Sequence, residues 1–204
     1  DQMVRGTVVH DGSTPDLRIW DGTVAYQVGD APESTLTGLA ATLQLEPELS
    51  FDLSARAQPL ALGTVAELFP GMPFRTARFA GPIRLSGTME RFDVQAELAG
   101  SAGSIAASGF VEPGTPLRFD LSGNVAAFNA EAVLTRPVPV EGPVNGTFAV
   151  NGTSEAFAFN VDLLQPASGA DPGGNFALAG TVRAGGAGPA LTTLRRDVTK
   201  LNHR

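Results

Sequence analysis

The chain reads SGTMERFDVQAEL over residues 86–98 and NGTSEAFAFNVDL over residues 151–163. The two stretches align without a gap, 65 positions apart. Each has a Gly-Thr pair at its second and third positions and continues as a strand-like segment. A second repeated segment lies upstream: the sequence FDLS at residues 51–54 recurs 68 positions later, at residues 119–122. A strand-like pattern that returns with a period in the middle sixties predicts one multi-strand unit, repeated and stacked along the chain.

Apolar and polar residues alternate with a period of two through most of these segments, which is the pattern of a half-buried strand. In residues 92–98, for example, Phe92, Val94 and Leu98 share one face while Asp93 and Glu97 take the other. Strands with one apolar and one polar face favour an antiparallel sheet over a buried parallel one. We expect one continuous apolar face, formed by Leu49, Phe51, Leu53, Ile83, Leu85, Phe92, Val94, Leu98, Leu117, Phe119, Leu121, Phe148, Phe157, Phe159, Val161 and Leu163.

The predicted fold is all-β, with one short helix in each repeat. Each helix is expected after an FDLS strand, at residues 62–69 and 128–134. The expected organisation is the end of a diverged unit at 1–44, one unit at 45–110, a second at 111–183, and a Gly-rich linker and tail at 184–204. The apolar residues of that tail are spaced as in a helix.

Charge and composition argue against several classes of partner. The net charge of −7 argues against nucleic acid and anionic lipid surfaces as partners. No run of residues approaches the length of a membrane span. Because the sequence begins in a strand-like segment, we expect it to be a piece of a longer protein, with any membrane anchor outside it.

The residues that carry chemistry in enzymes are sparse. The chain has no cysteine, and its two histidines, His10 and His203, lie near opposite ends, so no metal site or cofactor is predicted. The recurrence of Glu90 and Glu155 is better explained by a shared turn than by a pair of catalytic carboxylates. The sequence therefore predicts a protein that is not an enzyme.

Residues 59–70 read PLALGTVAELFP and residues 81–88 read GPIRLSGT. Followed by the alternating strand, these segments resemble the repeats of the AsmA-like superfamily, and within it the TamB-type translocation and assembly module proteins. The resemblance implies a periplasmic segment of a Gram-negative envelope protein that is anchored in the inner membrane. It also implies a curled sheet, open on one side, whose apolar lining carries phospholipid between inner and outer membrane. Outer-membrane assembly proteins would be partners through regions outside this chain.

A sheet with one apolar face must shield that face from water, because burying one Phe, Leu or Val side chain stabilises the fold by about 1.5–3 kcal/mol. The sequence leaves two solutions open. The sheet either curls into an open groove that meets acyl chains, or packs into a closed β-sandwich. The first predicts a lipid-shielding or lipid-conducting segment, and the second predicts a structural or adhesive module of a surface or secreted protein.

Overall fold

A computed structural model of the protein describes residues 2–9, 16–27, 32–45, 48–64, 77–135, 142–167, 173–185 and 188–200. Within these ranges, twelve strands form one antiparallel sheet, and their order in the sheet is their order in the sequence. The strands are β1 (Gln2–Val9), β2 (Asp16–Tyr26), β3 (Ser34–Gln44), β4 (Ser50–Ala61), β5 (Arg78–Thr88), β6 (Phe92–Gly100), β7 (Gly103–Glu112), β8 (Arg118–Asn129), β9 (Pro143–Thr153), β10 (Ala156–Gln165), β11 (Gly174–Gly185) and β12 (Gly188–Lys200).

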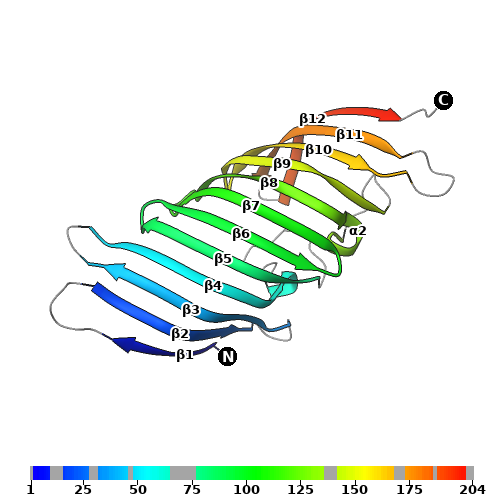
Figure 1. Cartoon of the computed structure of the whole chain (residues 1–204). Helices are drawn as coiled ribbons and strands as arrows, with labels where there is room; N and C mark the ends of the chain where they lie inside the picture. The colour runs from blue at the N-terminus through cyan, green and yellow to red at the C-terminus, as the bar shows by residue number, and fades with distance from the viewer. Residues whose placement is uncertain are drawn as a thin grey trace.

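The strands lie side by side along one long axis, and the two ends of the chain lie at opposite ends of the sheet (Figure 1). Strands β1 and β12 form the two edges. The all-β, antiparallel prediction is therefore confirmed. Because the described strands all belong to this one sheet, they do not form the two packed sheets of the alternative sandwich.

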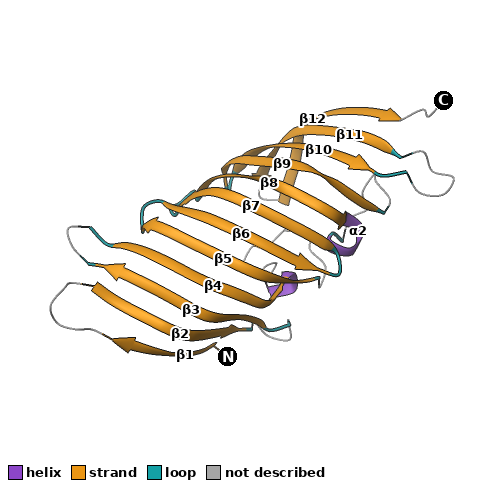
Figure 2. Cartoon of the chain, in the orientation of Figure 1, coloured by secondary structure: helices purple, strands orange, loops and turns teal. Residues whose placement is uncertain are grey.

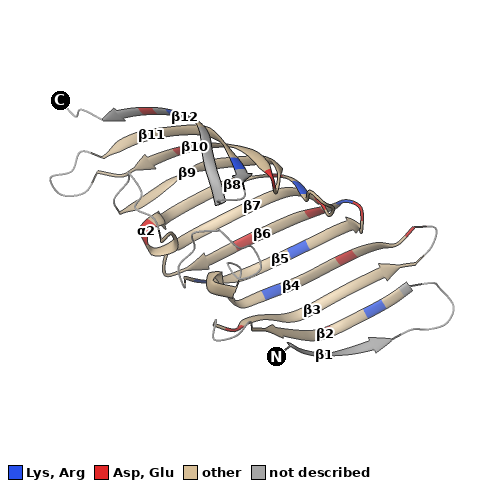
Figure 3. Cartoon of the chain, turned by 180° about the vertical axis from the view of Figure 1, so that it is seen from behind, with Lys and Arg blue, Asp and Glu red and all other residues tan. Residues whose placement is uncertain are grey.

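Charge separates the two faces of the sheet. Residues that pair across neighbouring antiparallel strands lie on the same face. In β4 to β10, every charged residue lies on one face, which we call the outer face, and Figure 3 marks these positions along the strands. They are Asp52, Arg56, Arg78, Arg84, Asp93, Glu97, Glu112, Arg118, Asp120 and Asp162. The opposite face carries no charge in these strands, because a charge there would oppose the burial of its apolar neighbours.

Two hairpin turns have the same hydrogen bonds. The Thr88 hydroxyl accepts from the backbone N–H of Glu90 (3.3 Å) and Arg91 (3.2 Å), and the Thr153 hydroxyl accepts from Glu155 (3.3 Å) and Ala156 (3.1 Å). Glu90 and Glu155 thus recur because they occupy equivalent turns. The repeated Gly-Thr pair in the sequence is the start of this turn.

The helical segments are shorter than predicted. The helix expected at 128–134 is α2 (Ala130–Val133), because Phe128 still pairs with Val144 and so extends β8 to Asn129. The Asn129 side chain then caps the helix, accepting from the N–H groups of Glu131 (3.0 Å) and Ala132 (3.3 Å). Of the helix expected at 62–69, residues 62–64 are helical and 65–69 lie outside the described residues. Both helical segments lie at the same ends of the strands, and neither lies at the β1 or β12 edge of the sheet (Figure 2).

The C-terminal segment differs from the expected linker and tail. Residues 188–200 form β12, which pairs with β11 along its whole length. Its leucines and valine have a helical spacing in the sequence. The segment forms a strand instead, because pairing with β11 satisfies the backbone N–H and C=O groups of that strand.

Gly87 and Gly152 are positions where the backbone requires glycine. Both have φ of +140°, and a Cβ atom on Gly87 would lie 2.5 Å from the carbonyl oxygen of Arg91. We expect Gly87→Ala and Gly152→Ala each to lower the free energy of unfolding by about 1–3 kcal/mol, measured by urea denaturation. Gly114→Ala is the matched control, since the nearest atom to its Cβ would be 3.5 Å away. Equal urea midpoints for Gly87→Ala and Gly114→Ala would contradict this account.

Candidate functional site

Apolar side chains of neighbouring strands lie opposite one another and form rows across the sheet. We call the face that carries these rows the apolar face. The first row contains Leu17, Leu43, Phe51, Gly87, Phe92, Val111, Phe119, Gly152, Phe157 and Val182, from β2 to β11. The second contains Ile19, Ala41, Leu53, Leu85, Val94, Gly109, Leu121, Val150, Phe159 and Gly180. Two further rows continue the same face toward the helical end of the strands.

The structure brings the predicted residues together on this face. Those in the two further rows are Ile83, Phe148, Val161, Leu98 and Leu163. Leu49 and Leu117 stand immediately before β4 and β8, at the margin of the face, and Leu49 is 40% exposed. The alternation in the sequence was therefore sufficient to find many of the large apolar residues that β4 to β6 and β8 to β10 place on this face.

Strand β7 belongs to the face but was not predicted to contribute to it. Its inward positions include Ile105, Ala107, Gly109 and Val111, which pair with apolar positions of β6 and β8. Ala107 and Gly109 are small, and Phe110 on the outer face is apolar, so the alternation in hydrophobicity along β7 is weak. Phe176, Leu178 and Val182 of β11 were also missed, although they alternate with the more polar or smaller residues between them.

Burial changes along the strands. At the end next to the helical segments, Ala57, Phe79 and Val144 are 0%, 2% and 1% exposed. There Val133 of α2 packs in one cluster with Phe79 and Ala102. At the other end, the phenylalanines of the first row are only half-buried. The helical segments thus cover one end of the apolar face and leave the first row accessible.

Phenylalanine rings meet in pairs across a glycine, once in each predicted unit. The ring centroids of Phe51 and Phe92 are 5.7 Å apart with planes at 54°, and Gly87 lies between them in the row. Phe119 and Phe157 are 6.0 Å apart at 52°, with Gly152 between them. Glycine is needed here because a Cβ atom would lie 2.7 Å from the Cα atom of Phe92 at Gly87 and 2.6 Å from that of Phe157 at Gly152. The same arrangement on β4–β6 and β8–β10 gives the repeated sequence a repeated surface.

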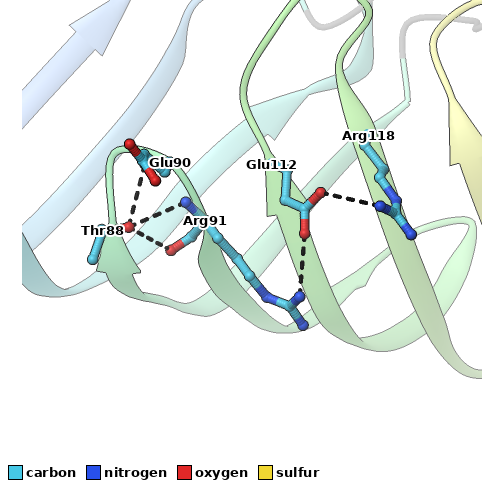
Figure 4. A network of polar contacts seen from close by, with 5 residues as sticks. All are labelled: Thr88, Glu90, Arg91, Glu112 and Arg118. Atoms are coloured by element: carbon cyan, nitrogen blue, oxygen red, sulfur yellow. Dashed lines mark hydrogen bonds and ion pairs between the residues drawn. The ribbon is translucent and has the colours of Figure 1, made fainter.

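A polar network lies on the outer face, at the end of the strands that carries the first row (Figure 4). Glu112 forms ion pairs with Arg91, at 3.1 Å, and with Arg118, at 3.6 Å. The Arg91 guanidinium also lies 3.7 Å from the ring centroid of Phe110, so it covers the aromatic ring that β7 carries on its outer face. Because the arginines are more than half exposed, each ion pair contributes only about 0–1 kcal/mol.

The described residues hold no group of three or more histidine or acidic side chains that could bind a metal ion. No helix within the described ranges is long and apolar enough to cross a membrane. What the apolar face offers chemically is burial of an apolar ligand surface. Comparisons with protein-family models, with curated proteins and with solved structures find no match for this chain.

The ring pairs generate a prediction. In a double-mutant cycle of Phe119→Leu and Phe157→Leu, we expect a coupling free energy of about 0.5–1.5 kcal/mol, because each ring loses its partner in the other variant. Chemical denaturation of the four proteins measures it. The control cycle pairs Phe92→Leu with Phe157→Leu, whose strands lie about 19 Å apart at ~4.8 Å per strand. Equal coupling in the two cycles would show that the ring contact does not stabilise the sheet.

Proposed function

We propose that the apolar face shields or conducts the acyl chains of phospholipids. The observation that carries this proposal is an apolar face that has no charged residue from β4 to β10. It is covered at one end of its strands and only half-buried at the other. Leaving such a face in water is unfavourable, and an acyl chain would bury it without requiring a hydrogen bond from the protein.

The dimensions of the face fit this role. From β2 to β11 the rows cross nine interstrand spacings, about 43 Å at ~4.8 Å each. One leaflet of a bilayer is about 15 Å thick in its hydrocarbon part, half of the ~30 Å core. An acyl chain lying along a row would therefore occupy only part of it, and could move along the row from one predicted unit to the next.

The finer shape belongs to the proposal as well. We propose that the sheet curls around its apolar face into a repeat-built groove that is open along the first row. Bulges at equivalent places in β4, between Ala57 and Leu60, and in β8, between Val125 and Phe128, support this shape. A bulge bends its strand and increases the local twist, which is how sheets acquire curvature. Headgroups would remain in water at the polar turns that border the first row.

The sequence resemblance to TamB-type proteins supports a cellular setting for this role. We propose that the chain is a periplasmic segment of an envelope-spanning protein that is anchored in the inner membrane. Phospholipid would then pass between inner and outer membrane, in support of outer-membrane biogenesis. Outer-membrane assembly proteins would bind through other regions of that protein.

Binding of a fluorescent fatty acid tests the proposal. We expect the purified chain to bind the probe saturably, and native mass spectrometry to detect co-purified phospholipid. Leu121→Asp places a charge in the second row, so probe affinity should fall at least tenfold, about 1.4 kcal/mol. Ser122→Asp is the matched control, since Ser122 is the next residue of the same strand and is exposed on the outer face.

Circular dichroism of both variants separates the proposal from its alternative. In a half-buried groove, Leu121→Asp should retain the β-sheet spectrum while losing probe binding. In a structural module with a closed core, Leu121→Asp should unfold the chain while Ser122→Asp does not. A wild-type chain that is lipid-free and does not bind the probe would also overturn the proposal.

A further inference from the structure

A small hollow lies on the outer face near the N-terminal end of the sheet, on the side opposite to the apolar face. It has a volume of about 180 Å³ and spans β2, β3 and β4. The outer-face side chains that line it are Arg18, Trp20, Ala40, Thr42, Asp52 and Ser54. The proposed acyl-chain function uses none of them.

The hollow exists because short side chains stand beside a large one. Ala40 pairs with Ser54 across β3 and β4, and neither fills the space next to the Trp20 ring. Trp20 is 43% exposed, although tryptophan is usually among the more buried residues of a protein. An exposed indole beside a hollow provides a flat apolar wall with an N–H donor at its edge.

The backbone around Trp20 is irregular. The pairing of β2 with β3 shifts between Ile19 and Gly22, and Asp21 adopts a φ of +49°, in the left-handed region. This region favours glycine, although aspartate adopts it more readily than most other residues. Bulges are known to re-aim side chains next to functional sites. A bulge beside the exposed ring points to a use for Trp20 beyond packing of the sheet.

The polar groups of the hollow carry both signs of charge. Thr42 pairs with Arg18 on one side and with Asp52 on the other, so the three side chains form one row. Asp52 also lies 3.9 Å from Arg84, and both of these side chains are exposed. A phosphate in the hollow would be repelled by Asp52, and a cation would be repelled by Arg18 and Arg84. A neutral ligand with many hydroxyl groups can accept from the guanidinium and donate to the carboxylate.

We propose that this hollow binds one ring of a neutral sugar. The C–H face of the ring would pack on Trp20, and its hydroxyl groups would bond to Arg18, Asp52 and the hydroxyls of Thr42 and Ser54. The site accommodates a single ring, with neighbouring rings of a longer glycan extending over the outer face. A partner of this kind would hold the segment by its outer face while the apolar face remains accessible.

The fluorescence of Trp20 tests this directly, because it is the chain's one tryptophan. The probes are D-glucose, N-acetyl-D-glucosamine and its β-1,4-linked trisaccharide, with inorganic phosphate as the anion probe. We expect the emission to change with at least one sugar and to approach saturation by about 10 mM, as a dissociation constant of about 1 mM would give. Isothermal titration calorimetry with Trp20→Phe should show a loss of affinity of about tenfold.

Asp52→Asn should weaken sugar binding by about tenfold, since it removes the charged acceptor. Its control is Asp120→Asn, because Asp120 holds the same place in the second FDLS segment and lies exposed on the same face. Equal effects of the two variants would overturn the proposal. So would a response to phosphate alone, or no response to any sugar up to about 10 mM. These results would leave the acyl-chain proposal untouched, since that proposal concerns the opposite face.

Discussion

The structure depends on one constraint, the alternation of apolar and charged residues in strands that all belong to a single sheet. Every charged residue of β4 to β10 lies on the outer face, and the opposite face has rows of apolar side chains that continue from strand to strand. Strand pairing satisfies the backbone hydrogen bonds. It cannot cover the apolar face, because a sheet buries a face only against another layer. What covers this face is therefore the functional question that the fold poses.

The chain answers part of that question itself. Leu62 after β4 and Val133 after β8 pack in one cluster with Phe79 and cover that end of the strands. The other end has the paired phenylalanines, and the glycines between them are fixed by their backbone conformation as much as by the lack of space for a side chain. The turns beside them close with the same threonine hydrogen bonds in both units. Repetition thus preserves the accessible end of the face, which is the part that the proposed function uses.

The sequence was most informative where large apolar residues alternate with polar or smaller ones, as in Phe92–Leu98 and Phe157–Leu163. It was silent on β7, where alanine and glycine reach the apolar face without a contrast in hydrophobicity. The helix expected at 128–134 was too long because Phe128 pairs with β9, and a pairing between distant segments is invisible to local pattern. The C-terminal strand was missed for the same reason, since Val198 is held opposite Phe176 by the sheet. The hollow at Trp20 needs residues from three strands, so only the register could bring them together.

The most direct test is to measure how accessible the apolar face is to a thiol reagent. The chain has no cysteine, so a single introduced cysteine is the only thiol that can react. Single substitutions Leu121→Cys and Ser122→Cys would be labelled with a maleimide in the folded protein, with and without short-chain phospholipid. We expect both thiols to react without lipid, and lipid to protect only the one at position 121. A thiol at position 121 that is unreactive in the lipid-free folded protein would contradict this expectation, because the face would then already be covered by the chain itself.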